Sequence, residues 1–313
     1  MKRFLIAVLA LAGLWSVGQP AQAQNKVVLG ISLASDTNPF YIAMRKGIEA
    51  RAAELGWEAR FVTANEQVNA QVNGVQDLVA QKVTGILISP IDEVATSAAY
   101  EAANKAKIPI ISIARHSRSP FESLHVIMDE VQIGREIAAF VAKAAEGKGK
   151  VAVLAGPAGA ATFKNLKQGF EEEIKKASGM PIVYSRDLAL TREQGLNQAE
   201  DVLVAHPDIR AIYCGNDEIA LGAAQAVAAA GKKGKVIITG LNGIPPAMKA
   251  VADGNIDLTV ALNPMAWGKL GVDTMDSWLK GQKTAKDKAF LKHTLVDKGN
   301  VAALMPPPPP PKN

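Results

Sequence analysis

The chain is poor in the residue types from which catalytic and metal sites are usually built. Its 313 residues contain one cysteine, Cys214, which excludes an internal disulfide and a cysteine-based metal site. Cys214 ends the apolar run 211–214, where a buried small hydrophobic residue is expected. The four histidines are scattered without i,i+4 spacing, and no serine lies in a G-x-S-x-G elbow. With no nucleophile–base pair evident, we predict that the chain is not an enzyme and needs no metal or cofactor.

A block of like charges and a long apolar span are missing as well. The formal net charge is only +5, with 35 Lys+Arg and 30 Asp+Glu interspersed, so no surface for nucleic acid is expected. The one strongly apolar stretch, residues 4–17, is too short to cross a bilayer. It follows Lys2 and Arg3 and leads to the small-residue ending AQA at 21–23, the pattern of a secretory signal peptide. We predict cleavage after Ala23, which leaves an exported, soluble chain rather than a membrane-anchored one.

Buried-strand patterns alternate with amphipathic helical patterns along most of the chain. They lie at 27–34, 58–63, 85–90, 108–113 and 124–128 in a first round, and at 151–154, 182–188, 211–214, 236–239 and 258–261 in a second. Near-continuous apolar strands separated by helices are typical of parallel α/β sheets. A helical pattern at 266–280 and a strand pattern at 291–295 follow both rounds. We therefore predict an α/β protein with two doubly wound, parallel-sheet lobes.

Polar and aromatic side chains follow several of these strands. The loop 35–41, with Asn38, Phe40 and Tyr41, comes directly after the first strand and opens a helix, for which Asn38 is a suitable N-cap. By itself the loop also fits a capped helix whose rings only pack in the core. Other polar residues at strand ends are Arg115, Asn216 and Asn242. Because open parallel sheets bind ligands at these ends, the combination indicates a small-solute site between two lobes.

Seven short segments recur in one known family of binding proteins. They are NPFY (38–41), NGVQDLV (73–79), ILISP (86–90), IPII (108–111), GF (169–170), AHPDIRA (205–211) and GNDEIALG (215–222). Together they make the chain resemble the type I periplasmic solute-binding proteins of ABC importers. The resemblance is to the ribose/galactose branch, in particular its ribose-binding members, and it spans nearly all of residues 26–300.

The resemblance implies two lobes joined by a three-segment hinge, with the ligand in the cleft between them. The expected parts are a signal peptide (1–23), an N-terminal lobe (24–128 plus 263–290), a C-terminal lobe (129–262 plus 291–304) and a proline-rich tail (305–313). The six prolines of the tail favour an extended, disordered chain. The family further implies a monomer in the periplasm that delivers its solute to an inner-membrane permease.

The family's ligand-binding positions carry over unevenly. Residues suited to a sugar are kept at Asn38, Phe40, Tyr41, Arg115 and Asn216. The departures are Ala114 and Asn242 where the family has aspartate, Leu166 where it has arginine, Leu190 where it has phenylalanine, and Leu262 where it has glutamine. Lys164 and Asn165 lie near enough in sequence to replace the arginine. The polar lining of the family's sugar site is thus depleted.

These departures predict a solute with fewer hydroxyls than ribose. Leaving one buried hydroxyl unpaired costs about 1–3 kcal/mol, and Ala114, Leu166 and Leu262 remove several partners. We expect weak binding of free ribose, and a smaller or deoxygenated solute, a polyol, or a sugar derivative whose anionic group pairs with Arg115. A sensor that presents its solute to a chemoreceptor or sensor kinase is the alternative function. A cytoplasmic repressor of the same fold is disfavoured by the signal peptide and by the lack of a helix-turn-helix region.

Overall fold

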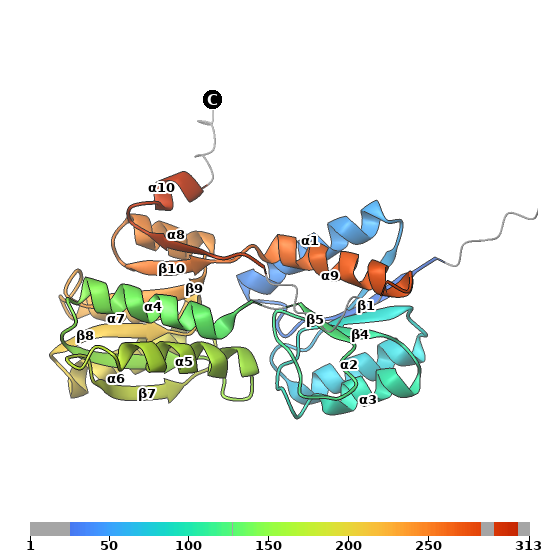
Figure 1. Ribbon diagram of the computed structural model, residues 1–313, viewed down its shortest axis with the longest axis horizontal. Coiled ribbons are helices and arrows are strands. Elements are labelled where there is room, and N and C mark those ends of the chain that lie inside the picture. Colours follow the sequence, from blue (N-terminus) through green and yellow to red (C-terminus); the bar gives the residue numbers. More distant parts are fainter. Residues whose placement is uncertain (1–25, 127, 283–290, 306–313) are drawn as a thin grey trace, which may run out of the picture.

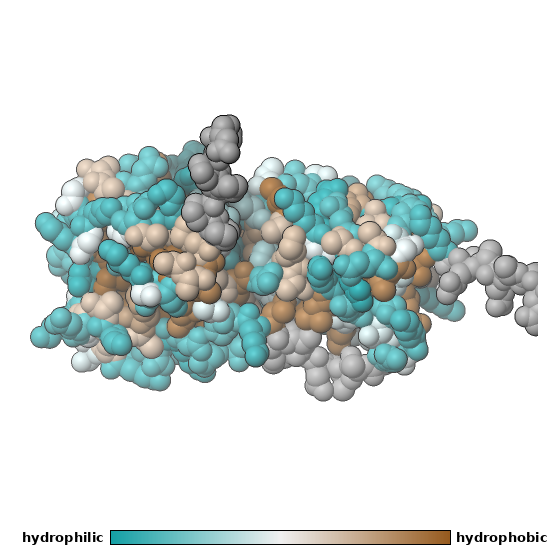
Figure 2. Space-filling view, turned by 90° about the horizontal axis from the view of Figure 1, so that it is seen from above, coloured by the Kyte–Doolittle hydropathy of each residue, from teal (hydrophilic) through white to brown (hydrophobic). Residues whose placement is uncertain are grey.

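The computed structural model describes residues 26–126, 128–282 and 291–305, which form two α/β lobes side by side (Figure 1). The predicted signal peptide 1–23 and the prolines 306–311 lie outside these residues. Hydrophilic residues cover much of both lobes on the face seen in Figure 2, with smaller apolar areas between them. Within the described ranges, no helix has the length and apolar character needed to cross a membrane.

The first lobe is built on a five-stranded parallel sheet in the order β2-β1-β3-β4-β5. Its strands are β1 (Val28–Ser32), β2 (Glu58–Val62), β3 (Gly85–Ile88), β4 (Ile110–Ile113) and β5 (Leu124–Val126). Helices α2 (Val68–Ala80) and α3 (Ser97–Lys105) pack on one face, and α1 (Pro39–Glu54) and α9 (Pro264–Leu279) on the other (Figure 1). Ile86 and Leu87 point to opposite faces and are both fully buried, which explains the near-continuous apolar strand patterns.

The second lobe is built on a six-stranded sheet in the order β11-β10-β9-β8-β6-β7. Its strands are β6 (Lys150–Ala155), β7 (Ile182–Asp187), β8 (Ile209–Cys214), β9 (Ile237–Asn242), β10 (Leu258–Ala261) and β11 (Thr294–Asp297). Its helices are α4 (Glu130–Ala144), α5 (Ala161–Ile174), α6 (Arg192–Ala205), α7 (Asp217–Ala229), α8 (Pro245–Ala252) and α10 (Val301–Leu304). All pairs are parallel except β10 with β11, which is antiparallel. Cys214 is fully buried at the end of β8, as predicted.

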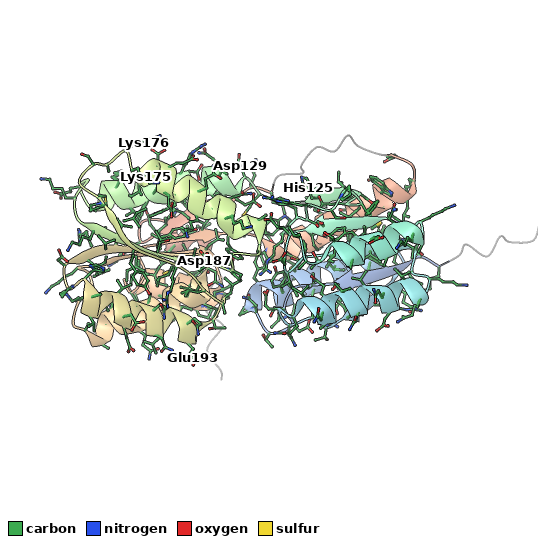
Figure 3. The ribbon with its side chains drawn as sticks, turned by 90° about the horizontal axis from the view of Figure 1, so that it is seen from below. His125, Asp129, Lys175, Lys176, Asp187 and Glu193 are labelled. Carbon is green, nitrogen blue, oxygen red and sulfur yellow. The ribbon has the colours of Figure 1, made fainter. Side chains whose placement is uncertain are left out.

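The chain passes between the lobes three times. The first crossing joins β5 to α4, and Figure 3 shows His125 in one lobe and Asp129 at the start of α4 in the other. The second joins β10 to α9, which packs against α1 of the first lobe. The third returns from α9 to β11 and includes residues 283–290, which lie outside the described residues. The predicted α/β class with two lobes of mainly parallel sheet is confirmed.

Glycines allow helices α4 and α5 to pack closely in the second lobe. A Cβ on Gly134 would lie 2.1 Å from the Leu166 carbonyl oxygen, and one on Gly169 would lie 2.0 Å from the Val131 carbonyl oxygen. Real Cβ atoms do not approach this closely, so only glycine permits this spacing. The two backbones therefore fix α5 against α4, and this contact orients the first turn of α5 toward the other lobe.

The two lobes touch along the cleft between them. The amide of Glu93, in the loop after β3, donates to the carbonyl of Gly159, just before α5, with an N···O distance of 2.8 Å. Lys164 Nζ on α5 lies 2.5 Å from the Glu93 carboxylate, which also accepts from Arg118 Nε at 3.0 Å. The contacts of Glu93 with Gly159 and Lys164 join the two lobes in a closed arrangement.

Candidate functional site

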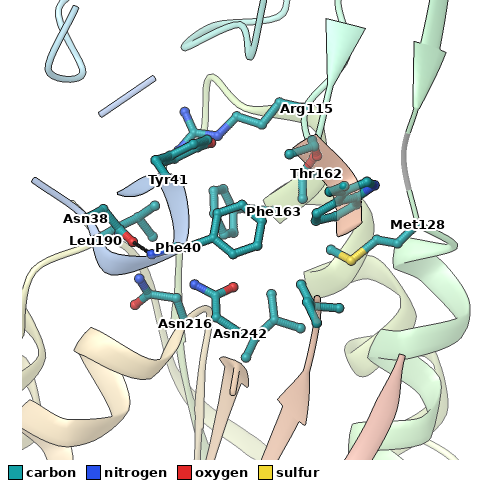
Figure 4. Close-up of a pocket in the computed structure, with 14 residues that line it drawn as sticks. Asn38, Phe40, Tyr41, Arg115, Met128, Thr162, Phe163, Leu190, Asn216 and Asn242 are labelled. Carbon is teal, nitrogen blue, oxygen red and sulfur yellow. Dashed lines mark hydrogen bonds between the residues drawn. The ribbon is translucent and has the colours of Figure 1, made fainter. Parts of the chain in front are cut away.

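A small cavity lies between the lobes, and domain interfaces are a common place for small-molecule sites (Figure 4). Its lining comes from both lobes and consists of Asn38, Phe40, Tyr41, Ala114, Arg115, Met128, Thr162, Phe163, Leu190, Asn216, Leu241, Asn242, Leu262 and Trp267. Most of these residues follow strands or begin helices, because the carboxyl ends of both sheets meet at the cleft. The structure brings together nine of the ten sequence-predicted site residues here, Leu166 being the exception.

The loop before α1 supplies an amide and two aromatic rings. Asn38 caps α1, its Oδ1 accepting from the Phe40 amide at 3.0 Å, as predicted for an N-cap. This bond occupies the side-chain oxygen and leaves the Asn38 amide group as a donor. The Phe40 ring lies edge-on to both Tyr41 and Trp267, with centroid distances of 5.2 and 5.5 Å. The rings therefore pack in the core and also form the wall of the cavity.

Arg115 is held by a carboxylate that the sequence interpretation did not include. Its Nη1 and Nη2 donate to the two oxygens of Glu66 at 3.0 and 2.9 Å. The guanidinium also lies 5.7 Å from the Tyr41 ring centroid and 5.5 Å from that of Phe163. Burial by itself lowers the pKa of Arg115, but Tyr41 and Glu66 outweigh it, so the pKa lies above its ordinary value. The expectation that Arg115 waits for an anionic group of the solute is not supported by this geometry.

The second lobe contributes amides to the opposite side of the cavity. Figure 4 shows Asn216 and Asn242 together, facing Arg115 across the cavity. Asn216 caps α7 through Oδ1, which accepts from the Ile219 amide at 2.9 Å. Among the described residues, two buried donors of the lining have no hydrogen-bond partner: Asn216 Nδ2 and Trp267 Nε1. Because buried polar groups are normally paired, these donors indicate that the cavity accepts oxygen atoms of a solute.

Glu130 lies behind the cavity at the start of α4. Its carboxylate accepts from Thr162 Oγ1 and Asn165 Nδ2, both at 3.3 Å, and Thr162 Oγ1 lies equally 3.3 Å from the Ala114 carbonyl oxygen. Burial raises the pKa of Glu130 to about 6. Thr162 thus joins the two lobes at the cavity wall, with a titratable group behind it.

The family is decided by comparison with known proteins. A family model described as periplasmic binding protein domain matches residues 29–283. The chain belongs to this family. The ribose import binding protein RbsB of Bacillus subtilis is 33% identical over 270 residues, covering 86% of this chain and 87% of the relative. The D-allose-binding periplasmic protein of Escherichia coli is 35% identical over 272 residues, covering 83% and 87% respectively.

Solved structures of periplasmic binding proteins share the fold. An ABC transporter periplasmic solute-binding protein from Actinobacillus succinogenes, solved with bound D-allose, is 27% identical to this chain. It superimposes with a TM-score of 0.83 and covers 89% of this chain and 100% of its own. The predicted resemblance to the ribose-binding branch of the periplasmic binding proteins is therefore confirmed.

Leu166 does not line the cavity of this binding protein. It is fully buried on α5, and its carbonyl oxygen lies against Gly134 of α4. Thr162 lies one turn earlier on the same helix and reaches the cavity instead. Neither proposed substitute for the arginine enters the lining, because Lys164 pairs with Glu93 and Asn165 with Glu130. Only the first turn of α5 faces the solute site.

Several residues of the site were not predicted from the sequence. Those in the lining are Met128, Thr162, Phe163, Leu241 and Trp267. Glu66, which pairs with Arg115, comes shortly after the second strand. The rule that polar residues after strands form the site would have identified Glu66 if it had been applied to that strand as well. Phe163 and Trp267 carry no comparable signal, since an aromatic residue in a helical apolar pattern reads as core.

Proposed function

We propose that this protein is the exported substrate-binding subunit of an ABC importer and that it captures a small sugar-like solute between its lobes. The cavity shared by both lobes carries the proposal. The relatives named for ribose import and D-allose binding support the solute class, and the hinge-like triple connection supports capture by lobe closure. The closed form would then be recognised by an inner-membrane permease after the signal peptide has directed the chain to the periplasm.

The lining favours a solute with fewer hydroxyls than ribose. Apart from Tyr41 and Trp267, whose rings are mainly apolar, only five residues of the lining carry polar side chains: Asn38, Arg115, Thr162, Asn216 and Asn242. Phe163, Leu190 and Leu262 bring apolar surface from the second lobe and its connection. A ribose hydroxyl placed against such surface without a partner costs about 1–3 kcal/mol. A deoxysugar with one apolar face, or a short polyol with fewer hydroxyls than ribose, therefore suits this lining better than ribose does.

Calorimetric titration of the mature protein tests this proposal. We expect 2-deoxy-D-ribose and other deoxypentoses to bind at least tenfold more tightly than D-ribose, because fewer of their hydroxyls lose water. The matched control is the double variant Leu190→Phe/Leu262→Gln, which restores two residues of the family pattern. This variant should show a smaller difference in affinity between ribose and the deoxygenated solutes. Micromolar binding of ribose, at about −8 kcal/mol, with weaker binding of the deoxygenated solutes, would contradict the proposed solute class.

A further inference from the structure

We propose that Glu66 is a specificity-determining residue that excludes anionic solutes by occupying Arg115. The inference deepens the proposed function and rests on it. Arg115 is the only residue of the cavity lining that carries a full charge, so whatever pairs with it sets the charge that the solute meets. Glu66 does not line this cavity; it lines the adjoining groove between the lobes, which shares Asn38 and Leu190 with it.

The pair leaves Arg115 little capacity for a second anion. Both terminal nitrogens donate to the Glu66 carboxylate, and such paired bonds are the strongest that arginine forms. Tyr41 and Phe163 lie on the guanidinium from the two lobes, and Arg115 is only 2% exposed. An anionic solute would have to displace Glu66 or lie beside its negative charge. Either arrangement disfavours the anion, and repulsion of this kind is a common source of specificity.

The backbone around Glu66 is built to keep this carboxylate in place. Asn65 and Glu66 have φ values of 45° and 58°, a conformation that non-glycine residues adopt rarely and at some energetic cost. The Glu66 amide donates to the Ala34 carbonyl at 2.7 Å, and Asn65 Oδ1 accepts from the Asp36 amide at 3.0 Å. The strained turn is thus tied to the loop that leads into Asn38.

The donors that remain suit a neutral solute. Asn216 Nδ2 and Trp267 Nε1 are unpaired among the described residues, and Asn38 keeps its amide donors because its oxygen caps α1. Neutral oxygens, such as those of hydroxyl, carbonyl or ring ether groups, satisfy such donors without a charge. A carboxylate would find no free cation to balance it within the cavity lining. We therefore assign to the site a solute that is uncharged as well as poor in hydroxyls.

Paired probes that differ at one terminal carbon, a neutral CH2OH group in one member and a carboxylate in the other, test the role of Glu66. Erythritol and D-erythronate share their carbon skeleton, as do glycerol and D-glycerate, and calorimetry gives the affinity ratio within each pair. For the wild-type protein we expect the neutral member to bind and the acid to bind at least tenfold more weakly. Glu66→Gln keeps the size of the side chain and should improve binding of the acid at least tenfold, because Arg115 becomes an unpaired cation.

Two further variants locate the effect. Glu218→Gln removes the same charge from the adjoining groove, where Glu218 pairs with Arg192, and should leave the affinity ratio unchanged. Glu66→Gln/Arg115→Met removes both charges and should abolish the gain for the acid, which a merely structural role of Glu66 would not explain. If Glu66→Gln does not fold, the inference is tested by the affinity ratio of acid to neutral solute in the wild-type protein and in the double variant.

The outcomes separate this inference from the function on which it rests. Tighter binding of an acid than of its neutral partner to the wild-type protein would overturn the inference and leave solute capture standing. The inference would also be overturned, with solute capture left standing, if Glu66→Gln preferred the neutral member of each pair as strongly as the wild-type protein does. If none of the four probes nor any sugar binds to the wild-type protein, the proposed function fails and the inference falls with it.

Discussion

At the residue scale, Glu130 couples the stability of the second lobe to pH. The carboxylate is 4% exposed, and its pKa is raised from 4.5 to about 6 by burial. The folded protein therefore holds the proton more tightly than the unfolded chain does. The resulting stabilisation is fully present below about pH 4.5 and is lost as the pH rises through about 6.

Glu130→Gln should remove this pH dependence. From the shift, the free energy of unfolding of the wild-type protein should fall by about 2 kcal/mol more than that of the variant between pH 4.5 and pH 7. Asp217 is fully buried, and its pKa is likewise raised to about 6. Because Asp217 has the same effect on stability in both proteins, the difference between their unfolding free energies reports on Glu130 alone. Urea unfolding at a series of pH values measures it, with Glu172→Gln on the outer face of α5 as control. Parallel curves for Glu130→Gln and wild type would contradict the assignment.

At the scale of elements, the contact between α4 and α5 decides which side chains reach the solute. Thr162 and Phe163 lie in the first turn of α5 and line the cavity, while Leu166 packs against α4 one turn further on. The same device occurs in the first lobe, where a Cβ on Gly47 of α1 would lie 2.1 Å from the Met265 carbonyl oxygen of α9. In each lobe, two helices beside the cleft thus pack closely through glycine.

Gly169→Ala should destabilise the protein by about 3 kcal/mol, because its Cβ meets a backbone oxygen that cannot rotate away. Chemical unfolding measures the loss. The matched control is Gly271→Ala on α9, whose Cβ would lie 3.1 Å from a methyl group of Ile113. There the better helix propensity of alanine, up to about 1 kcal/mol, should largely offset the crowding. Equal losses in the two variants would show that helix spacing at α4 and α5 is not set by glycine.

At the scale of the whole molecule, the closed arrangement depends on contacts between the lobes around Glu93. Burial by itself raises the pKa of Glu93, but the hydrogen bond and charge of Lys164, with Arg118, outweigh it, so the pKa lies below its ordinary value. The carboxylate is therefore charged while the cleft is closed. Arg118 belongs to the same lobe as Glu93, whereas Lys164 belongs to the other, so only the lysine pair requires closure.

Lys164→Met should speed release of the bound solute about fivefold, as expected from losing a partly exposed ion pair worth about 1 kcal/mol. Stopped-flow measurement with 2-deoxy-D-ribose or erythritol, whichever binds the wild-type protein, gives the rate. The rate should also depend less on salt than that of the wild type. Lys167→Met is the control, since Lys167 pairs with Asp187 of its own lobe. A release rate unchanged by Lys164→Met would mean that this pair does not stabilise closure.

The sequence by itself determined what depends on near neighbours in the chain. Apolar strand patterns such as 85–90, and the Asn38 cap before α1, follow from burial on both sheet faces and from a bond across two residues. The strand-end rule then located Asn38, Arg115, Asn216 and Asn242, because parallel strands present their ends at one edge. The two-lobed fold could be predicted for the same reason.

Only the tertiary structure decided which of these residues face the solute and with what charge. Glu66 and Arg115 are 49 residues apart, so no local pattern pairs them, and we infer from their pairing that the site favours a neutral solute over an anion. Leu166 was misplaced because the rotation of α5 is set by its contact with α4, not by the periodicity of α5 itself. Local sequence fixes which side chains an element carries. Packing between distant elements fixes where those side chains point, because it depends on contacts that exist only after the chain has folded.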